Sequence, residues 1–256
     1  MQLIDINAEK GCKVITFPDG EKHLIVDEID RKDEVEIKCR IASSNDLFVL
    51  MQLSDILNRQ AVCVKRIDIP YLMSMRCDRL FSINQPFTLK IVADVINSFN
   101  AESVTICEAH SNRAIQLIKN STSVTFPSKS DEDVYCFPDM GAAKRYHNQY
   151  DNPIICEKTR SAVTGKLSGF NIVSLGSYKR GMSIRVLDDL CDGGSTFIGI
   201  AELLKALDPS KLVLEVTHAV NYSGIIKVSE VYDKVYITNS YKDWTDLPNN
   251  VIIRNL

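Results

Sequence analysis

The stretch that decides the fold is "IRVLDDLCDGGSTFIGIAELLKAL", from Ile184 to Leu207. An apolar run leads into the adjacent aspartates Asp188 and Asp189, and a third aspartate, Asp192, precedes two glycines, a serine and a threonine. After this turn, apolar residues return with the spacing of a helix. The pattern predicts a buried strand, a tight polar turn and an amphipathic helix. In open α/β proteins, ligands bind beyond the carboxyl ends of such strands.

The turn itself has the chemistry of a phosphate site. Gly193 and Gly194 allow the backbone to curl and present N–H groups, and the start of the following helix adds positive charge. Ser195 and Thr196 can donate hydroxyl hydrogen bonds to the same anion. The alternative is purely structural: residues Asp192–Thr196 would then only cap a helix.

The two adjacent aspartates suit a different part of the ligand. Carboxylates repel phosphate, so Asp188 and Asp189 are expected to accept hydrogen bonds from the vicinal hydroxyls of a ribose or to hold magnesium through water. Two neighbouring acids at the end of a buried strand are costly to bury without a function. The stretch therefore favours a sugar-phosphate site over a helix cap alone.

The rest of the chain alternates apolar, β-branched runs with helical patterns. Strands are expected at residues 12–17, 46–53, part of 61–72, 103–109, 133–139, 152–158, 183–190, 211–220 and 234–240, with a short terminal strand. Helices are expected at residues 85–99, 112–120, 140–150 and 196–207. This alternation predicts an α/β fold with mainly parallel sheets flanked by helices.

Composition narrows the class of protein. The chain has 256 residues, 45% of them hydrophobic, and a formal net charge of −3, which does not favour nucleic-acid binding. No apolar run is long enough for a membrane span, and the first residues lack a signal-peptide pattern. The 8 cysteines are spaced singly, which favours reduced thiols over a zinc site and predicts a cytoplasmic protein.

Five collinear motifs resemble the ribose-phosphate diphosphokinase (PRPP synthetase) family. "VLDDLCDGGSTF" resembles the ribose-5-phosphate loop of the type I phosphoribosyltransferase fold, and four segments narrow the resemblance. These are "FPDGE" (17–21), "IDIPYLMSMRCDR" (67–79), "ICEAHS" (106–111) and "CFPDMGAAKR" (136–145). The closing strands, "VTHAV" and "VYITNSY", match as well. The resemblance runs from about residue 12 to residue 242.

The resemblance implies two phosphoribosyltransferase-like domains. The first is expected at residues 1–124, joined by a C-terminal strand within 241–256, and the second at residues 125–240. The polar stretch Lys119–Asp133 is expected to be the linker between them. The family binds ATP between its two domains and commonly at a subunit interface, so a homo-oligomer, dimer or hexamer, is expected.

The resemblance also implies a reaction. The anomeric 1-hydroxyl of ribose 5-phosphate would attack the β-phosphorus of ATP, giving PRPP and AMP, with Mg²⁺ as the cofactor. Lys158 and Arg160, in "EKTR", correspond to the family's mobile catalytic loop and would neutralise charge on the transferred β-phosphate.

Binding roles follow motif by motif from the same resemblance. Residues expected to bind ATP are Phe17, Asp19, Glu21, Arg76, Asp78, Arg79 and His110. His110 and Asp139 are expected around the magnesium ion, and the ribose phosphate is assigned to Asp188, Asp189, Asp192, Gly193, Gly194, Ser195 and Thr196.

Three alternatives remain open. The chain departs from the family pattern at Leu80, Asn84, Gln85, Met140 and Ala142, around the nucleotide site and the subunit contacts. The same chemistry could therefore act on a larger acceptor such as ADP-ribose, as in a route of NAD salvage. A phosphoribosyltransferase, or a non-catalytic relative that assembles with a partner enzyme, would also use this fold.

Overall fold

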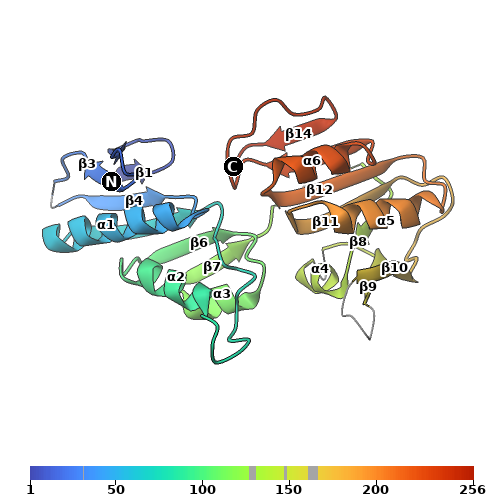
Figure 1. Ribbon diagram of the computed structural model, residues 1–256, viewed down its shortest axis with the longest axis horizontal. Coiled ribbons are helices and arrows are strands. Elements are labelled where there is room, and N and C mark those ends of the chain that lie inside the picture. Colours follow the sequence, from blue (N-terminus) through green and yellow to red (C-terminus); the bar gives the residue numbers. More distant parts are fainter. Residues whose placement is uncertain (31, 127–130, 147–148, 161–166) are drawn as a thin grey trace. The chain divides into compact units, whose positions relative to one another are not determined.

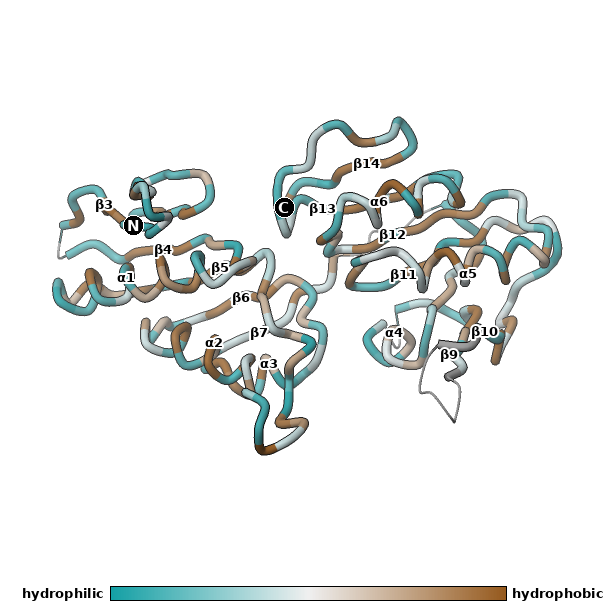
Figure 2. Tube along the Cα trace, in the orientation of Figure 1, coloured by the Kyte–Doolittle hydropathy of each residue, from teal (hydrophilic) through white to brown (hydrophobic). Residues whose placement is uncertain are grey.

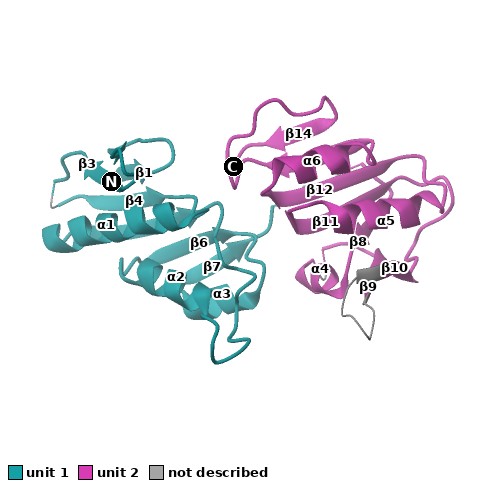
Figure 3. Ribbon diagram, viewed as in Figure 1, with its two compact units in different colours: residues 1–126 teal, residues 127–256 magenta. Residues whose placement is uncertain are grey.

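A computed structural model of the chain describes residues 1–30, 32–126, 131–146, 149–160 and 167–256. The chain divides into two compact units, Met1–Phe126 (unit 1) and Pro127–Leu256 (unit 2), coloured separately in Figure 3. Each unit has its own mainly parallel sheet with helices beside it, which confirms the expected α/β fold (Figure 1). Among the described residues, no helix is both long enough and apolar enough to cross a membrane.

Unit 1 is built on a parallel sheet with the strand order β1-β4-β5-β6-β7. Its strands are β1 (Gln2–Asp5), β4 (Glu34–Lys38), β5 (Cys63–Ile69), β6 (Ser103–Cys107) and β7 (Ser121–Val124). A separate antiparallel hairpin consists of β2 (Cys12–Thr16) and β3 (Lys22–Val26). The helices are α1 (Ser44–Gln60), α2 (Thr88–Asn97) and α3 (Asn112–Leu117).

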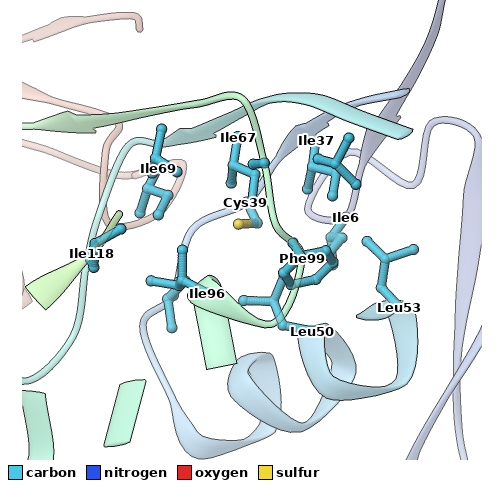
Figure 4. Close-up of a cluster of buried hydrophobic side chains, with 14 of the residues drawn as sticks. Ile6, Ile37, Cys39, Leu50, Leu53, Ile67, Ile69, Ile96, Phe99 and Ile118 are labelled. Atoms are coloured by element: carbon cyan, nitrogen blue, oxygen red, sulfur yellow. The ribbon is translucent and has the colours of Figure 1, made fainter. Parts of the chain in front are cut away.

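The core of unit 1 lies between its sheet and its helices. Figure 4 shows Leu50 and Leu53 of α1 and Ile96 of α2 among isoleucines of the strands, such as Ile37 and Ile67. All five side chains are at most 2% exposed. Burying each one stabilises the fold by roughly 1.5–3 kcal/mol, so this core holds the unit together.

The segment 46–53, predicted as a strand, is part of helix α1, so that prediction is wrong. The many apolar residues of this segment also follow helical spacing. Val49, Leu50, Leu53 and Leu57 are all buried on one face of the helix. The side chain of Ser43 caps the helix in a capping box with Asp46. The capping box and the helical spacing favour a helix more strongly than the β-branched and apolar composition favours a strand.

The stretch Lys119–Asp133, predicted as a linker, contains a strand instead. β7 (Ser121–Val124) pairs in parallel with β6 and forms the edge of the sheet of unit 1. Polar composition suits this edge strand, because Thr122, Ser123 and Val124 are exposed. The linker prediction is therefore wrong over these residues.

Unit 2 is built on a larger sheet with the order β10-β9-β8-β11-β12-β13-β14. All neighbouring strands are parallel except β9 and β10, which are antiparallel. The strands are β8 (Val134–Phe137), β9 (Ile154–Arg160), β10 (Leu167–Ser174), β11 (Ile184–Cys191), β12 (Leu212–Ala219), β13 (Lys234–Thr238) and β14 (Val251–Arg254). The helices are α4 (Met140–Arg145), α5 (Ser195–Lys205) and α6 (Tyr222–Ser229). In Figure 2, hydrophobic stretches coincide with strands such as β12 and β14.

The terminal strand belongs to unit 2, not to the N-terminal domain as predicted. β14 pairs in parallel with β13, with Val235 opposite Val251. The side chain of Asn250 donates to the carbonyls of Ser229 and Tyr232 and fixes the turn that precedes the strand. The Pro-Asn-Asn turn therefore returns the chain to the sheet it has just left.

Candidate functional site

The two aspartates of the deciding stretch lie near the carboxyl end of β11, next to a buried arginine. Arg145, the last residue of α4, places Nη1 3.0 Å from Oδ1 of Asp188 and 2.9 Å from Oδ1 of Asp189. The side chains of Arg145 and Asp188 are 13% exposed, and that of Asp189 is 2% exposed. One guanidinium therefore bridges two neighbouring carboxylates away from most of the solvent.

Within the group formed by Arg145, Asp188 and Asp189, the electrostatics disfavour a negative charge on both aspartates. Burial, followed by the charge of Asp189, raises the pKa of Asp188 well above its ordinary value, and Arg145 partly offsets this. The shift means that Asp188 is held next to a like charge in a low-dielectric place. Such strained carboxylates are typical of functional sites, because a fold without a ligand gains little from them.

A second ion pair lies in the same cluster. Lys158 of β9 places Nζ 2.8 Å from Oδ2 of Asp139, which follows β8. Oδ1 of Asp139 accepts the backbone amides of Gly141 and Ala142 and so caps α4, the helix that ends in Arg145. Burial would raise the pKa of Asp139, but the hydrogen bond from Lys158 and these amides lower it below its ordinary value.

The two ion pairs share one place in unit 2. β8, β9 and β11 are neighbours in the sheet, and α4 connects Asp139 to Arg145. The charge of Asp139 also contributes to the raised pKa of Asp188, which reflects their proximity. The structure thus brings Lys158, Asp139, Asp188 and Asp189 together in unit 2, and their assignment to substrate stays a prediction. Sequence analysis did not identify Arg145 as a site residue. Its only signal was that a basic residue stood in one motif, while the paired aspartates of another motif needed a cation.

The loop after β11 forms a tight turn into α5. Gly194 has a φ of 79°, in the left-handed region, and caps the helix that begins at Ser195. Gly224 of α6 lies so close that a Cβ there would be 1.7 Å from the carbonyl oxygen of Asp192. The side chain of Asp192 lies 3.5 Å from Nδ2 of Asn221. These contacts hold the loop in one shape, with the free first-turn amides of α5 available to an anion.

In unit 1, several predicted ATP-binding residues follow β5 and β6, two neighbouring strands. Arg79 pairs with Asp78, with Nε 2.8 Å from Oδ1, and 70% of the arginine side chain is exposed. The hydrogen bond from Arg79, with a further one from Ser111, lowers the pKa of Asp78. His110, adjacent to Ser111, donates its backbone amide to Sδ of Met75. Asp78, Arg79 and His110 are therefore near one another, and Arg76 is exposed in the same loop.

Phe17, Asp19 and Glu21 lie elsewhere in unit 1. They form the exposed tip of the β2–β3 hairpin, where the amide of Glu21 donates to Oδ1 of Asp19. The hairpin packs against α1, and Gln52 of that helix hydrogen-bonds the backbone of β3 at Lys22 and Leu24. The hairpin follows β1 in the chain and packs on α1, whereas Arg79 lies in the loop between β5 and α2.

The magnesium assignment rests on residues in different units, His110 in unit 1 and Asp139 in unit 2. Within the described residues there is no group of three or more His, Cys, Asp or Glu side chains that could hold a metal. Asp139 is already committed to Lys158 and to the start of α4. Arg160 ends β9, but its side chain lies outside what the structure describes.

Comparison with known proteins finds distant relatives of this chain. No protein-family model matches the chain. A ribose-phosphate pyrophosphokinase of Pyrococcus furiosus is 25% identical over 250 residues, covering 90% of this chain and 86% of the relative. That of Thermosipho africanus is 26% identical over 267 residues, covering 96% and 82%. The crystal structure of phosphoribosylpyrophosphate synthetase from Mycobacterium smegmatis matches with a TM-score of 0.73 at 19% identity, covering 95% of this chain and 85% of that one, and so shares the fold.

Proposed function

We propose that this chain, a distant homologue of the ribose-phosphate pyrophosphokinases, transfers the β,γ-diphosphate of ATP to the anomeric 1-hydroxyl of ribose 5-phosphate and releases AMP. One observation carries the proposal: the Lys158–Asp139 pair and the Arg145-bridged aspartates lie together beside the glycine turn that opens α5. This arrangement offers a cation for a transferred phosphate, acceptors for sugar hydroxyls and a seat for a phosphate ester.

The acceptor half of the reaction is assigned to the β11–α5 connection. The first-turn amides of α5 and the hydroxyls of Ser195 and Thr196 would bind the 5-phosphate. Asp188 and Asp189 would accept hydrogen bonds from the ribose hydroxyls. Because Arg145 already fixes both carboxylates, little freedom is lost when the sugar binds, and this favours affinity.

The transfer itself requires charge neutralisation rather than covalent chemistry. The 1-hydroxyl oxygen forms a bond to the β-phosphorus while the bond from that phosphorus to the bridging oxygen of AMP breaks, and AMP leaves in line. The hydroxyl proton passes to solvent or to a nearby carboxylate. Lys158 would exchange its contact with Asp139 for the phosphoryl oxygens, where a cation stabilises developing charge.

We expect magnesium at this site as an ion carried by the nucleotide. Among the described residues no group of three or more ligating side chains forms a protein-built cage, and Mg²⁺ in phosphoryl-transfer sites commonly keeps its waters and binds substrate phosphates with one or two carboxylates. Asp139 of unit 2 would contribute to that shell, and His110 of unit 1 is assigned to the bound nucleotide. When bound, the ion would neutralise the β- and γ-phosphate oxygens.

The nucleotide half is assigned to unit 1. Arg76 and Arg79 would meet the ATP phosphates, and Phe17 offers an exposed ring on which adenine could stack. Phe17 lies at the tip of the β2–β3 hairpin and Arg79 in the loop between β5 and α2. The family resemblance implies a homo-oligomer with ATP at a subunit interface, so a second copy would supply one of the two groups.

The test is AMP release by the purified chain with ATP and magnesium. Ribose 5-phosphate and ADP-ribose are offered in separate reactions, and a reaction without acceptor is the control. AMP with ribose 5-phosphate supports the proposal, and AMP with ADP-ribose alone moves the acceptor to the larger ester. AMP in neither reaction contradicts the diphosphokinase function. Consumption of PRPP with a nucleobase would then identify a phosphoribosyltransferase.

A further inference from the structure

The strand that carries Lys158 is held by few neighbours at the lysine itself. In the described part of the sheet, β8 pairs with β9 at Cys136↔Ile154 and Phe137↔Ile155, and the register ends there. Lys158 lies beyond this pairing, and the residue directly opposite it on β10 is Phe170. The position of the lysine therefore depends on how the β9–β10 strand pair is attached to the rest of unit 2.

Phe170 attaches that strand pair to helix α5. A Cβ built on Gly199 of α5 would lie 2.2 Å from Cε2 and 2.5 Å from Cδ2 of the Phe170 ring, closer than real contacts allow. The ring thus occupies space that only a glycine leaves open. Glycine inside a helix costs roughly 0.5–1 kcal/mol relative to alanine, so the helix alone does not favour this residue. The contact with Phe170 therefore explains why a glycine stands at position 199.

The same helix opens with the proposed phosphate loop. Gly199 follows Gly194, the cap of α5, by five residues, a rise of roughly 7.5 Å along the helix axis. Residues directly opposite each other in an antiparallel pair project from the same face of the sheet. Phe170 and Lys158 therefore leave the strand pair on the face that meets α5. The ring connects the lysine-bearing strand to the helix whose first turn would bind the phosphate.

We propose that Phe170, seated on Gly199, is a positioning residue that sets the place of Lys158 relative to the loop Asp192–Thr196. The inference rests on the proposed function, in which Lys158 meets the transferred phosphate and the loop holds the acceptor. Displacing the ring would move β9 away from α5 and shift the lysine. Misplacement of a reacting group by about 1 Å can cost up to about 100-fold in rate.

The test combines activity with chemical labelling of Lys158. Gly199→Ala introduces a methyl group into the ring, whereas Gly169→Ala in the same strand pair meets only Oγ1 of Thr159 at 3.5 Å, an ordinary contact. We expect Gly199→Ala to lower kcat by about tenfold or more with little change in KM for the sugar phosphate. Gly169→Ala should keep the wild-type kcat. Phe170→Leu alone leaves a gap beside Gly199, whereas in the double variant the smaller leucine packs against the larger alanine. Combining Gly199→Ala with Phe170→Leu should therefore recover most of the lost kcat.

Labelling separates this inference from the proposed function. Limiting acetic anhydride followed by peptide mass spectrometry measures how readily Lys158 reacts, and the ion pair with Asp139 protects it in the wild type. Gly199→Ala should raise labelling of Lys158, and Gly169→Ala should not. A wild type that releases no AMP would overturn the proposed function, and labelling would still decide the packing claim.

The inference is overturned if Gly199→Ala matches Gly169→Ala in both kcat and labelling. It is also overturned if the double variant recovers neither, because the loss in Gly199→Ala would then not come from its contact with Phe170. If Gly199→Ala does not fold, Phe170→Leu alone replaces it. That variant should fold, lose kcat and expose Lys158, and wild-type values for both would contradict the proposal.

Discussion

Arg145 of unit 2 lies between Asp188 and Asp189 with 13% of its side chain exposed, whereas Arg79 of unit 1 pairs with Asp78 with 70% exposed. The two arginines stand in opposite environments. The proposed acceptor half is built from largely buried, mutually fixed charges within unit 2. The proposed nucleotide half, in unit 1, presents exposed groups that a ligand must organise. The contrast predicts that mutations in unit 2 change stability and activity together, while mutations in unit 1 change nucleotide affinity alone.

The largest expected effect is on catalysis, at Lys158. Lys158→Ala removes the cation assigned to the transferred phosphate and should lower kcat by about 10²–10³-fold. AMP release at saturating substrates measures the loss, and circular dichroism checks the fold. Lys205→Ala, at the exposed end of α5, is the matched control and should keep wild-type kcat. Equal activity of the two variants would remove Lys158 from the mechanism.

The next effect compares the two arginines directly. Arg145→Met leaves two buried carboxylates without their cation, so we expect the free energy of unfolding to fall by about 3–5 kcal/mol. Arg79→Met breaks an exposed pair and should cost at most about 1 kcal/mol. Urea unfolding measures both. Similar losses in the two variants would contradict the difference between the units.

A substitution at Asp188 is expected to increase the free energy of unfolding, in contrast to the two arginine substitutions. The pKa of Asp188 is raised in the folded chain, so this carboxyl costs stability progressively as the pH rises from its ordinary pKa towards the raised one, and the full cost is present above the raised pKa. Asp188→Asn should therefore increase the free energy of unfolding at neutral pH while impairing sugar-phosphate binding. The gain should vanish as the pH falls below 3.8, the ordinary value, where the wild-type carboxyl is protonated in both states. Thermal unfolding across pH measures this, and a variant less stable than the wild type at neutral pH would contradict it.

The smallest effect on stability is expected at the hairpin of unit 1. Phe17 is 43% exposed, so Phe17→Ala should change the free energy of unfolding by about 0.5 kcal/mol or less. KM for ATP should still rise, since the ring is assigned to adenine. Steady-state kinetics with varied ATP measures the change. An unchanged KM would remove the hairpin tip from the nucleotide site.

The deciding stretch allowed prediction of the strand, turn and helix around Asp188 because each has a local signal. Adjacent acids, paired glycines and helical spacing are all read within a few residues of one another. Resemblance added Lys158 and Asp139, which no local pattern marks. The two side chains form an ion pair in the structure, and their roles in the reaction stay predictions.

What the sequence could not predict depends on contacts between distant residues. Arg145 precedes Asp188 by 43 positions, and only the packing of α4 against β11 brings them together. The contact between Phe170 and Gly199 is of the same kind. The local sequence of the terminal strand fits either sheet equally well, and its pairing with β13 places it in the sheet of unit 2. Residues 46–53 resemble a strand in apolar composition, but the capping box at Ser43 starts a helix there.

The proposed reaction transfers a diphosphate, rather than a single phosphate, from ATP to the sugar. Phosphorus NMR of the wild-type chain with ATP, magnesium and ribose 5-phosphate tests this directly, because it resolves AMP, ADP and a new diphosphate ester in one sample. We expect equal amounts of AMP and a sugar diphosphate ester, formed only when the acceptor is present and lost in Lys158→Ala. Formation of ADP with a singly phosphorylated sugar, or an unchanged ATP spectrum with every acceptor, would contradict the proposed reaction.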